Sequence, residues 1–228
     1  MSKTGYVGFV TIGQSPRNDV LDDIGTILPR ELKIVQAGAL DEFNTAEEVY
    51  KNLRPASGET VYVTRMRSGE EVKVSKERLM PYVETKVRQL EEAGVDVVVI
   101  LCSGEFPEFD VAPVVVYPDK ILKGISSSIQ YRGPTAVLVP SSDHLQYGYK
   151  KWSKYFNEPL VIPISPYTAS LQQFAEVGNQ LKRNNIQLAV MDCVGYSFQQ
   201  KTIIREYSPS TKVVSTRGVI GRIVSELF

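Results

Sequence analysis

The chain of 228 residues has little of the chemistry that builds metal sites and disulfide frameworks, with two cysteines and one histidine. Two cysteines are too few to staple a chain of this length, and a reducing compartment would keep them as thiols. A single histidine and the lack of a Cys-X-X-Cys pair argue against a zinc site. We therefore expect no metal and no cofactor. Each cysteine needs its own explanation, because most buried free cysteines serve as small apolar residues.

The sequence also lacks an excess of charge and any long apolar run. Lysine plus arginine equals aspartate plus glutamate, 26 of each, so nothing favours nucleic acid or an anionic membrane as a partner. The longest apolar runs, such as residues 97–102, fall far short of the ~20 residues that span a bilayer. Residues 1–5 lead directly into a predicted strand with no segment typical of a signal peptide. We expect a soluble, cytoplasmic protein.

Two segments of the chain follow the same pattern: VVVILCSGEF at residues 97–106 and LAVMDCVGYS at residues 188–197. In each, a run too apolar to face water ends in a cysteine and a glycine-containing loop, which is typical of a buried strand in a parallel sheet. Ligands of open α/β sheets bind at the carboxyl ends of the strands. The pattern predicts that Cys102 and Cys193 face one ligand-binding cleft.

Strand and helix patterns alternate in two rounds, the second beginning near residue 134, and each round places a cysteine at the end of its third strand. Such alternation is typical of parallel sheets with helices on both faces. We predict an α/β fold of two pseudo-symmetric Rossmann-like lobes. The first lobe would comprise residues 1–117 plus 212–228 and the second residues 118–211, with the ligand bound in the cleft between the lobes.

A β-hairpin is predicted within the first lobe, because two alternating stretches flank Ser68-Gly69 in residues 60–75. We expect its Arg65 and Arg67 on a solvated face rather than in the cleft. The preceding residues 41–58 are polar and predict a loop with a single helical turn.

The loop after the first predicted strand reads Gly13-Gln14-Ser15-Pro16-Arg17. Ser15 is a favourable helix cap and Pro16 suits the first helical position. A strand, a polar loop and a helix N-terminus together make an anion site, to which Arg17 adds a fork for carboxylate or phosphate. Ordinary capping with a surface arginine explains the same residues. The loop is not the Gly-X-Gly-X-X-Gly of a dinucleotide site.

The segment TIGQSPR at residues 11–17, together with Met191-Asp192-Cys193, resembles the AroM family within the aspartate/glutamate (hydantoin) racemase superfamily. The resemblance covers nearly the full chain. It implies catalysis by Cys102 and Cys193, one thiolate removing a proton from a carbon and the other thiol returning one to the opposite face. It also implies a small-molecule carboxylate ligand, and a homodimer is compatible with it. The candidate substrate-binding residues are Thr11, Gln14, Ser15, Arg17, Ser103, Gly104, Glu105, Ser141, Ser142, His144 and Gly195.

The sequence departs from the racemase pattern after both cysteines. Racemases typically continue with Asn-Thr and Thr-His, whereas this chain has Ser103-Gly104-Glu105 and Val194-Gly195-Tyr196. Glu105 and Asp192 bring carboxylates near the thiols, and a nearby carboxylate raises the pKa of a thiol. His144, the one histidine, either contacts the ligand or belongs to a helix cap beside Asp143.

Two functions therefore remain open. One is a cofactor-independent racemase, isomerase or decarboxylase that uses cysteine on a small carboxylic acid. The other is a non-catalytic carboxylate-binding protein on the same scaffold.

Overall fold

The computed structural model describes residues 5–228 of the chain. Residues 1–4, which the sequence predicts to lead into the first strand without a signal segment, lie outside the described residues. The chain forms two compact units. The first comprises the described residues up to Asp119 together with Ile220–Phe228, and the second comprises Lys120–Val219. Within residues 5–228, no helix has both the length and the apolar character needed to cross a membrane.

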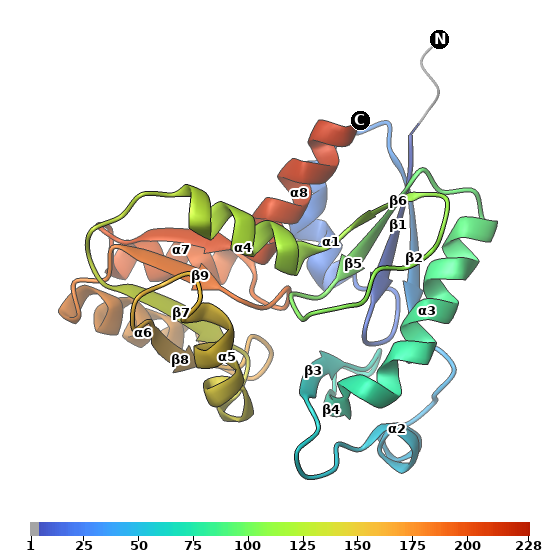
Figure 1. Ribbon diagram of the computed structural model, residues 1–228, viewed down its shortest axis with the longest axis horizontal. Coiled ribbons are helices and arrows are strands. Elements are labelled where there is room, and N and C mark those ends of the chain that lie inside the picture. The colour runs from blue at the N-terminus through green and yellow to red at the C-terminus, as the bar shows by residue number, and fades with distance from the viewer. Residues whose placement is uncertain (1–4) are drawn as a thin grey trace. The chain divides into compact units, whose positions relative to one another are not determined.

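The first unit is built on a four-stranded parallel sheet with the order β2-β1-β5-β6 (Figure 1). Its strands are β1 (Tyr6–Thr11), β2 (Lys33–Gly38), β5 (Val97–Leu101) and β6 (Val114–Val116). All residues of β5 are buried, as are all residues of β1 after the first. A strand covered on both faces has no polar side to present, which accounts for the unbroken aliphatic run before Cys102.

The helices that lie wholly within the first unit include α1 (Asn18–Gly25), α2 (Ala46–Leu53) and α3 (Lys76–Glu92). Helix α2 lies where the sequence predicts a loop with a single helical turn, so that prediction was wrong. Thr45 caps this helix, because its hydroxyl accepts a hydrogen bond from the Glu48 amide at 3.2 Å. Val49 and Leu53 of the same helix are fully buried in the core of the unit.

The predicted hairpin is present as the antiparallel pair β3 (Val61–Arg65) and β4 (Glu71–Ser75). Gly69 lies in its turn with φ +94°, a backbone conformation that favours glycine. Four hydrophobic side chains of the hairpin are buried in the core of the first unit: Tyr62, Met66, Val72 and Val74. The hairpin is therefore packed onto the unit and holds its turn in a defined place.

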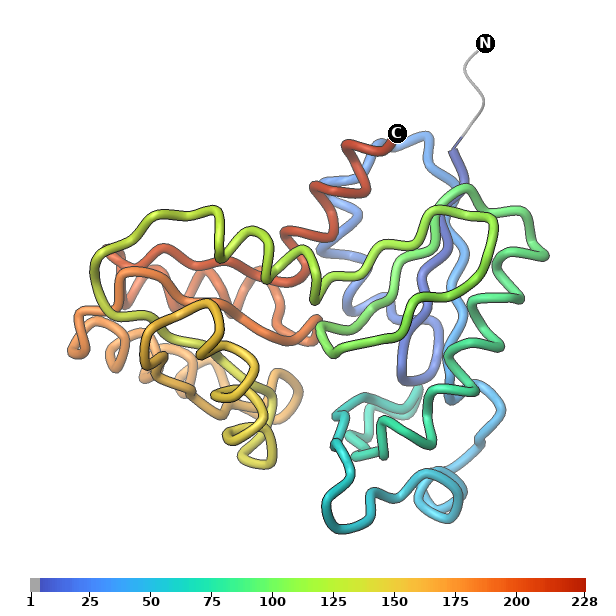
Figure 2. The backbone as a smooth tube through the Cα atoms, viewed as in Figure 1, coloured from blue at the N-terminus to red at the C-terminus, as the bar shows by residue number. Residues whose placement is uncertain are grey.

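The second unit has a parallel sheet with the order β10-β9-β7-β8. Its strands are β7 (Thr135–Val139), β8 (Leu160–Pro163), β9 (Leu188–Met191) and β10 (Lys212–Ser215). Numbered within its own round, each sheet has the strand order 2-1-3-4. Figure 2 follows the chain through these two rounds, the first from blue to green and the second from yellow to red. The predicted duplication is thus confirmed by strand topology.

Strand β10 corrects one predicted boundary. The sequence placed residues 212–228 in the first lobe, but β10 pairs with β9 in the sheet of the second unit. Only the last part of the following helix, from Ile220, belongs to the first unit.

The remaining helices are α4 (Pro118–Ser128), the short 3-10 turn η1 (Ser142–His144), α5 (Leu145–Trp152), α6 (Leu171–Arg183), α7 (Phe198–Tyr207) and α8 (Thr216–Leu227). Trp152 and Phe156 are buried and stack at 5.3 Å between ring centroids. Leu145 and Tyr149 of α5 are exposed, and Phe156 lies beyond the end of this helix at Trp152.

Candidate functional site

In each unit the candidate residues follow the two central strands of the sheet. The chain runs from β1 to β2 on one side and then crosses to β5 on the other, and it does the same from β7 to β8 and β9. Ligands of open α/β sheets bind outside the carboxyl ends of the strands at such a switch point. The loops at these ends are residues 12–17 and 102–106 in the first unit, and residues 140–144 and 192–197 in the second. They carry the predicted site residues other than Thr11, which is the last residue of β1.

The two cysteines have the same local geometry. Cys102 follows β5 directly and is partly exposed, and the Gly104 amide donates a hydrogen bond to its Sγ at 3.3 Å. Cys193 follows Asp192 at the end of β9 and is buried, and the Gly195 amide donates to its Sγ, also at 3.3 Å. A hydrogen bond to sulfur stabilises the charged form of a thiol relative to the neutral form. Each sulfur therefore has an amide hydrogen-bond donor within its own loop.

The glycines that donate these bonds have no room for a side chain. A Cβ on Gly104 would meet the ring of Tyr62, which belongs to the hairpin strand β3. A Cβ on Gly195 would lie 2.7 Å from Pro166 Cγ and 2.9 Å from the ring of Tyr167. In both loops a tyrosine ring presses against the Cys-X-Gly turn. The steric need for glycine explains why it recurs two residues after each cysteine.

The Asp192 carboxylate beside Cys193 is balanced inside the second unit. Lys151 Nζ donates to both carboxylate oxygens, at 3.0 and 2.9 Å, and Trp152 Nε1 donates to one of them at 2.6 Å. All three side chains are buried. The sequence predicted a carboxylate near this thiol, and the structure adds that this carboxylate lies in an ion pair with Lys151. The lysine is 41 residues away in the chain, so local sequence reasoning missed it.

Arg217 is a second residue that the sequence analysis missed. It lies in the first turn of α8 with 2% exposure, and its guanidinium donates to the carbonyl oxygens of Val194 and Gly195, both at 2.7 Å. These carbonyls belong to the residues that directly follow Cys193. Arg217 thus holds the loop that follows Cys193 and places a positive charge next to its backbone carbonyls. The one feature of the sequence that could have pointed to Arg217 is its position shortly after β10, the fourth strand of the second round.

Tyr196, in the same loop, is held by a hydrogen bond and an aromatic contact. Its hydroxyl donates to the Ile164 carbonyl at 2.8 Å, and its ring packs edge-on against Phe174 at 6.1 Å between centroids. Burial raises the pKa of Tyr196 well above its ordinary value, and the neighbouring Cys193, Asp192 and Tyr167 raise it further. Tyr196 therefore stays protonated and acts as a fixed donor rather than as a base.

The first loop of the first unit is held by long-range hydrogen bonds. We expected Ser15 to cap α1 and Pro16 to begin it, but α1 begins at Asn18 and its N-cap residue is Arg17, with no side-chain cap bond. Ser15 instead bonds to Asp41, with the amide donating to Oδ1 and the hydroxyl to Oδ2, both at 2.7 Å. Asp41 is 26 residues away, and this acceptor wins because it satisfies two donors of the loop at once.

Gln14 and Thr11 also have partners within the first unit. Gln14 is buried, its Nε2 donates to the Phe43 carbonyl at 2.6 Å, and its Oε1 accepts from the Arg67 amide at 2.7 Å. Thr11 Oγ1 accepts from the Gly13 amide at 3.2 Å. These two predicted ligand contacts therefore shape the loop at the carboxyl end of β1, and Gln14 ties it to the hairpin.

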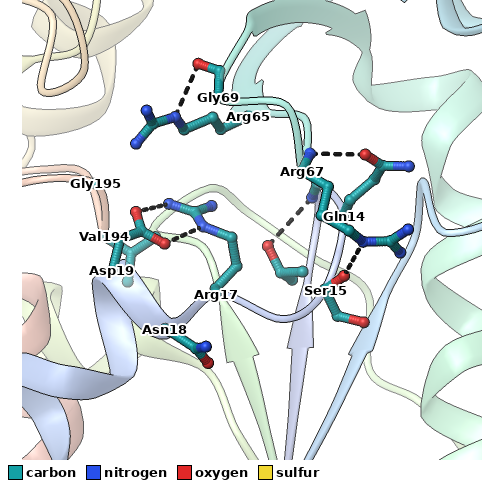
Figure 3. A network of polar contacts seen from close by, with 12 residues as sticks. Gln14, Ser15, Arg17, Asn18, Asp19, Arg65, Arg67, Gly69, Val194 and Gly195 are labelled. Atoms are coloured by element: carbon teal, nitrogen blue, oxygen red, sulfur yellow. Dashed lines mark hydrogen bonds and ion pairs between the residues drawn. The ribbon is translucent and has the colours of Figure 1, made fainter. Parts of the chain in front are cut away.

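Arg17 lies at the end of this loop, directly before α1. Its Nε and a terminal nitrogen donate to the two carboxylate oxygens of Asp19 at 2.8 and 2.9 Å. Figure 3 shows this fork with Arg65 and Arg67 of the hairpin turn nearby. All three arginines line one pocket of about 300 Å³. Arg67 is exposed, as the sequence predicts for a solvated hairpin face, and both arginines of the hairpin also line this pocket.

The other predicted residues are placed as follows. Ser103 is buried, and the backbone oxygen of Glu105 accepts from the Tyr62 hydroxyl at 2.9 Å. In the second unit, the Ser141 hydroxyl is 2.9 Å from His144 Nδ1, whereas Ser142 is exposed. His144 is 9% exposed. It thus belongs to the turn after β7, with Ser141 orienting its ring.

Comparisons with solved structures agree with this fold. The maleate isomerase Iso from Pseudomonas putida S16 is 13% identical, with a TM-score of 0.61 over 99% of this chain and 93% of that chain. An aspartate racemase from Picrophilus torridus is 12% identical, with a TM-score of 0.57 over 98% of this chain and 94% of that chain. Arylmalonate decarboxylase is 9% identical, with a TM-score of 0.54 over 96% and 92%. At these identities the likeness shows the fold.

No curated protein matches the chain in sequence. A family model described as AroM protein matches residues 7–228, which include both strand-end cysteines and both of the loops that precede them on the central strands. The structural neighbours are members of the aspartate/glutamate racemase superfamily, as the sequence resemblance implied. This chain belongs to the AroM family.

Proposed function

We propose that this protein is a cofactor-independent enzyme that acts on a small carboxylic acid through Cys102 and Cys193. The observation that carries the proposal is the repeated thiol geometry, in which each sulfur accepts an amide hydrogen bond at the carboxyl end of a central strand. The structural neighbours are named as racemases, an isomerase and a decarboxylase, and these names support chemistry of this kind.

The chemistry requires one group that takes a proton and one that gives a proton. A thiolate that removes the proton next to a carboxylate becomes a thiol and leaves a carbanion, whose charge spreads onto the carboxyl oxygens. A second thiol then protonates the carbanion on its other face and becomes a thiolate. Decarboxylation uses only the second step, because loss of CO2 itself generates the carbanion. The hydrogen bonds that the Gly104 and Gly195 amides donate to the sulfurs of Cys102 and Cys193 favour the thiolate that the first step needs.

Deuterium exchange tests the proposal without assuming a particular substrate. A panel of small carboxylic acids is incubated with the protein in D2O, and the loss of the proton next to the carboxylate is followed by NMR. The parent protein should exchange at least one acid, and Cys102→Ser and Cys193→Ser should each reduce the turnover by about 100-fold or more, since acid–base groups contribute about 10²–10⁴-fold. If Cys102→Ala and Cys193→Ala both retain every detectable turnover, the enzyme proposal is rejected.

The reactivity of the thiols provides a second, independent test. Alkylation by iodoacetamide is measured for each cysteine against pH by mass spectrometry, with and without dicarboxylic and keto acids. At least one thiol should react with a midpoint well below the ~8.5 of a free cysteine and should be protected by an acid of the panel. Two inert thiols in the folded protein would mean that both are packing residues.

A carboxylate-binding protein is the second candidate. The burial of Cys193, at 8% exposure, and the Val194-Gly195-Tyr196 sequence after it favour this candidate. Thermal stabilisation by an acid that survives the loss of both thiols, without any deuterium exchange in the parent, would favour binding over catalysis.

A further inference from the structure

A tyrosine of the hairpin contacts the loop that follows Cys102. Tyr62, on β3, donates a hydrogen bond from its hydroxyl to the backbone oxygen of Glu105 at 2.9 Å, and its ring lies 5.8 Å from that of Phe106 between centroids. Cys102 and Phe106 pack against the same hydrophobic core in which Tyr62 is buried. Two segments 43 residues apart in the chain are therefore joined by this side chain.

The position of Tyr62 is set by the hairpin and by the core of the first unit. Tyr62 is 4% exposed, and it pairs with Val74 of β4 in the antiparallel register. At the end of β3, the carbonyl of Arg65 accepts a hydrogen bond from the Gln14 amide at 3.2 Å. Figure 1 shows the hairpin on the side of the first sheet where β1 and β5 end. Tyr62 is thus a fixed point against which the cysteine loop rests.

The contact reaches the sulfur through Gly104. The ring of Tyr62 occupies the space that a side chain at this position would take, and the Gly104 amide donates to Cys102 Sγ at 3.3 Å. A hydrogen bond weakens steeply when its donor turns away from the acceptor. By confining Gly104 on one side and holding the Glu105 carbonyl on the other, Tyr62 fixes the direction of the amide that faces the sulfur.

The loop after Cys193 has a comparable hold of a different chemical kind. There Arg217 donates to the carbonyls of Val194 and Gly195 and also brings a positive charge. The phenol of Tyr62 is neutral at the pH at which a thiol titrates, because a tyrosine has an ordinary pKa of about 10. Any effect of Tyr62 on Cys102 therefore passes through the geometry of the loop.

We propose that Tyr62 is a positioning residue for Cys102, which keeps the Gly104 amide directed at the sulfur and so favours the thiolate. The inference rests on the proposed function in taking Cys102 as one of the two reacting thiols. It assigns to the hairpin the role of holding the cysteine loop of the first unit, as Arg217 holds that of the second.

Tyr62→Phe tests the inference, because it keeps the ring and removes the hydroxyl that binds Glu105. Alkylation by iodoacetamide is followed by mass spectrometry against pH for both cysteines in the same sample. The midpoint of Cys102 should rise by about 0.5 pH unit or more, since loss of a hydrogen bond to the charged form raises a thiol pKa. The midpoint of Cys193, in the other unit, should not change. Urea unfolding confirms that the variant is folded over the pH range used.

Tyr50→Phe is the matched control. Tyr50 lies in α2, and its hydroxyl accepts a hydrogen bond from the amide of Lys73 on β4 at 3.4 Å. This variant also removes a phenol hydroxyl that contacts the hairpin, but not one that binds the cysteine loop. Both midpoints should stay where they are in the parent.

A double variant tests whether the ring acts through Gly104. Gly104→Ala alone should shift the midpoint of Cys102, because the added methyl group meets the ring of Tyr62. In a Tyr62→Leu background the smaller side chain leaves room for the methyl group, so Gly104→Ala should then cause less than half of that shift. Residues in contact give non-additive effects of this kind, whereas independent residues give additive ones.

The inference is overturned if Tyr62→Phe leaves the Cys102 midpoint of a folded protein unchanged, as a merely structural role would. It is also overturned if Cys102 of the parent is inert or titrates at the ~8.5 of a free cysteine, or if the effects of Tyr62→Leu and Gly104→Ala are additive. A Tyr62-dependent midpoint in a protein without thiol-dependent deuterium exchange would retain the positioning role and reject the enzyme proposal.

Discussion

Lys151 and Asp192 form a buried ion pair at the end of β9, with Nζ 3.0 and 2.9 Å from the two carboxylate oxygens and side-chain exposures of 2% and 6%. The pair joins the last turn of α5 to the residue that precedes Cys193. Its position means that the carboxylate next to the thiol already has a cation. The loop is thereby anchored without adding net negative charge beside the sulfur.

The ion pair predicts a strong asymmetry between single and double substitutions. Lys151→Met removes the cation from a buried carboxylate that keeps the Trp152 indole as a donor, and should lower the free energy of unfolding by about 3–5 kcal/mol. Lys151→Met combined with Asp192→Leu should recover most of that loss, because the buried carboxylate is removed as well. Urea unfolding followed by fluorescence measures both. A single variant as stable as the parent would contradict this account.

Gly104→Ala and Gly195→Ala should each impair the protein, since the added methyl group meets Tyr62 in one loop and Pro166 and Tyr167 in the other. We expect losses of about 1–3 kcal/mol in the free energy of unfolding, typical of overpacking, together with reduced turnover and altered alkylation of the adjacent cysteine. Urea unfolding and alkylation followed by mass spectrometry provide the two measurements.

Gly124→Ala is the matched control for these two changes. Gly124 lies within α4, and a Cβ there would meet nothing within 4 Å. Alanine at this position should stabilise the helix by about 0.5–1 kcal/mol. If Gly104→Ala and Gly195→Ala behaved like Gly124→Ala, the tight contact with the tyrosine rings would be unimportant.

Arg217 acts as a positioning residue for Cys193, through the carbonyls of Val194 and Gly195. Arg217→Met should shift the pH midpoint of Cys193 alkylation upward, because it removes a nearby positive charge that favours the thiolate. Arg217→Lys should restore the midpoint in part but not the two-point hold on the loop. A merely structural role would lower stability and leave the midpoint in place once the variant is folded.

Tyr196 predicts how stability depends on alkaline pH. Its pKa is raised in the folded protein by burial and by the neighbouring Cys193, Asp192 and Tyr167, so the folded state retains the proton after the unfolded chain has lost it. The contribution is fully present below the ordinary tyrosine pKa of about 10 and is lost as the pH rises toward the folded value.

Tyr196→Phe should therefore remove a slope of up to about 1.4 kcal/mol per pH unit from the decline of stability above pH ~10. At neutral pH the variant should lose about 1 kcal/mol, the usual net value of a hydrogen bond such as that to Ile164. Denaturant unfolding of both proteins from about pH 8 to about pH 11 spans the ordinary tyrosine pKa and provides the measurement. Parallel curves across this range would show that Tyr196 does not carry the effect.

Local patterns in the sequence determined the α/β class, the order of strands and helices, the hairpin and the placement of both cysteines at strand ends. Buried parallel strands such as β5 must be apolar throughout, and helices such as α6 show the spacing of one buried face, so each is visible within a short window. The duplication was visible because the same order of strands and helices occurs twice along the chain.

Only the tertiary structure decided what surrounds the thiols and the first loop. Ser15 binds Asp41 rather than capping α1, Asp192 meets Lys151 from another element, and the hairpin carries Arg65 to the loop after β1. The same holds for β10, whose sheet is chosen by its pairing with β9. Hydrogen bonds and ion pairs between distant residues depend on how the elements pack, and the spacing of residues along the chain carries no record of that packing.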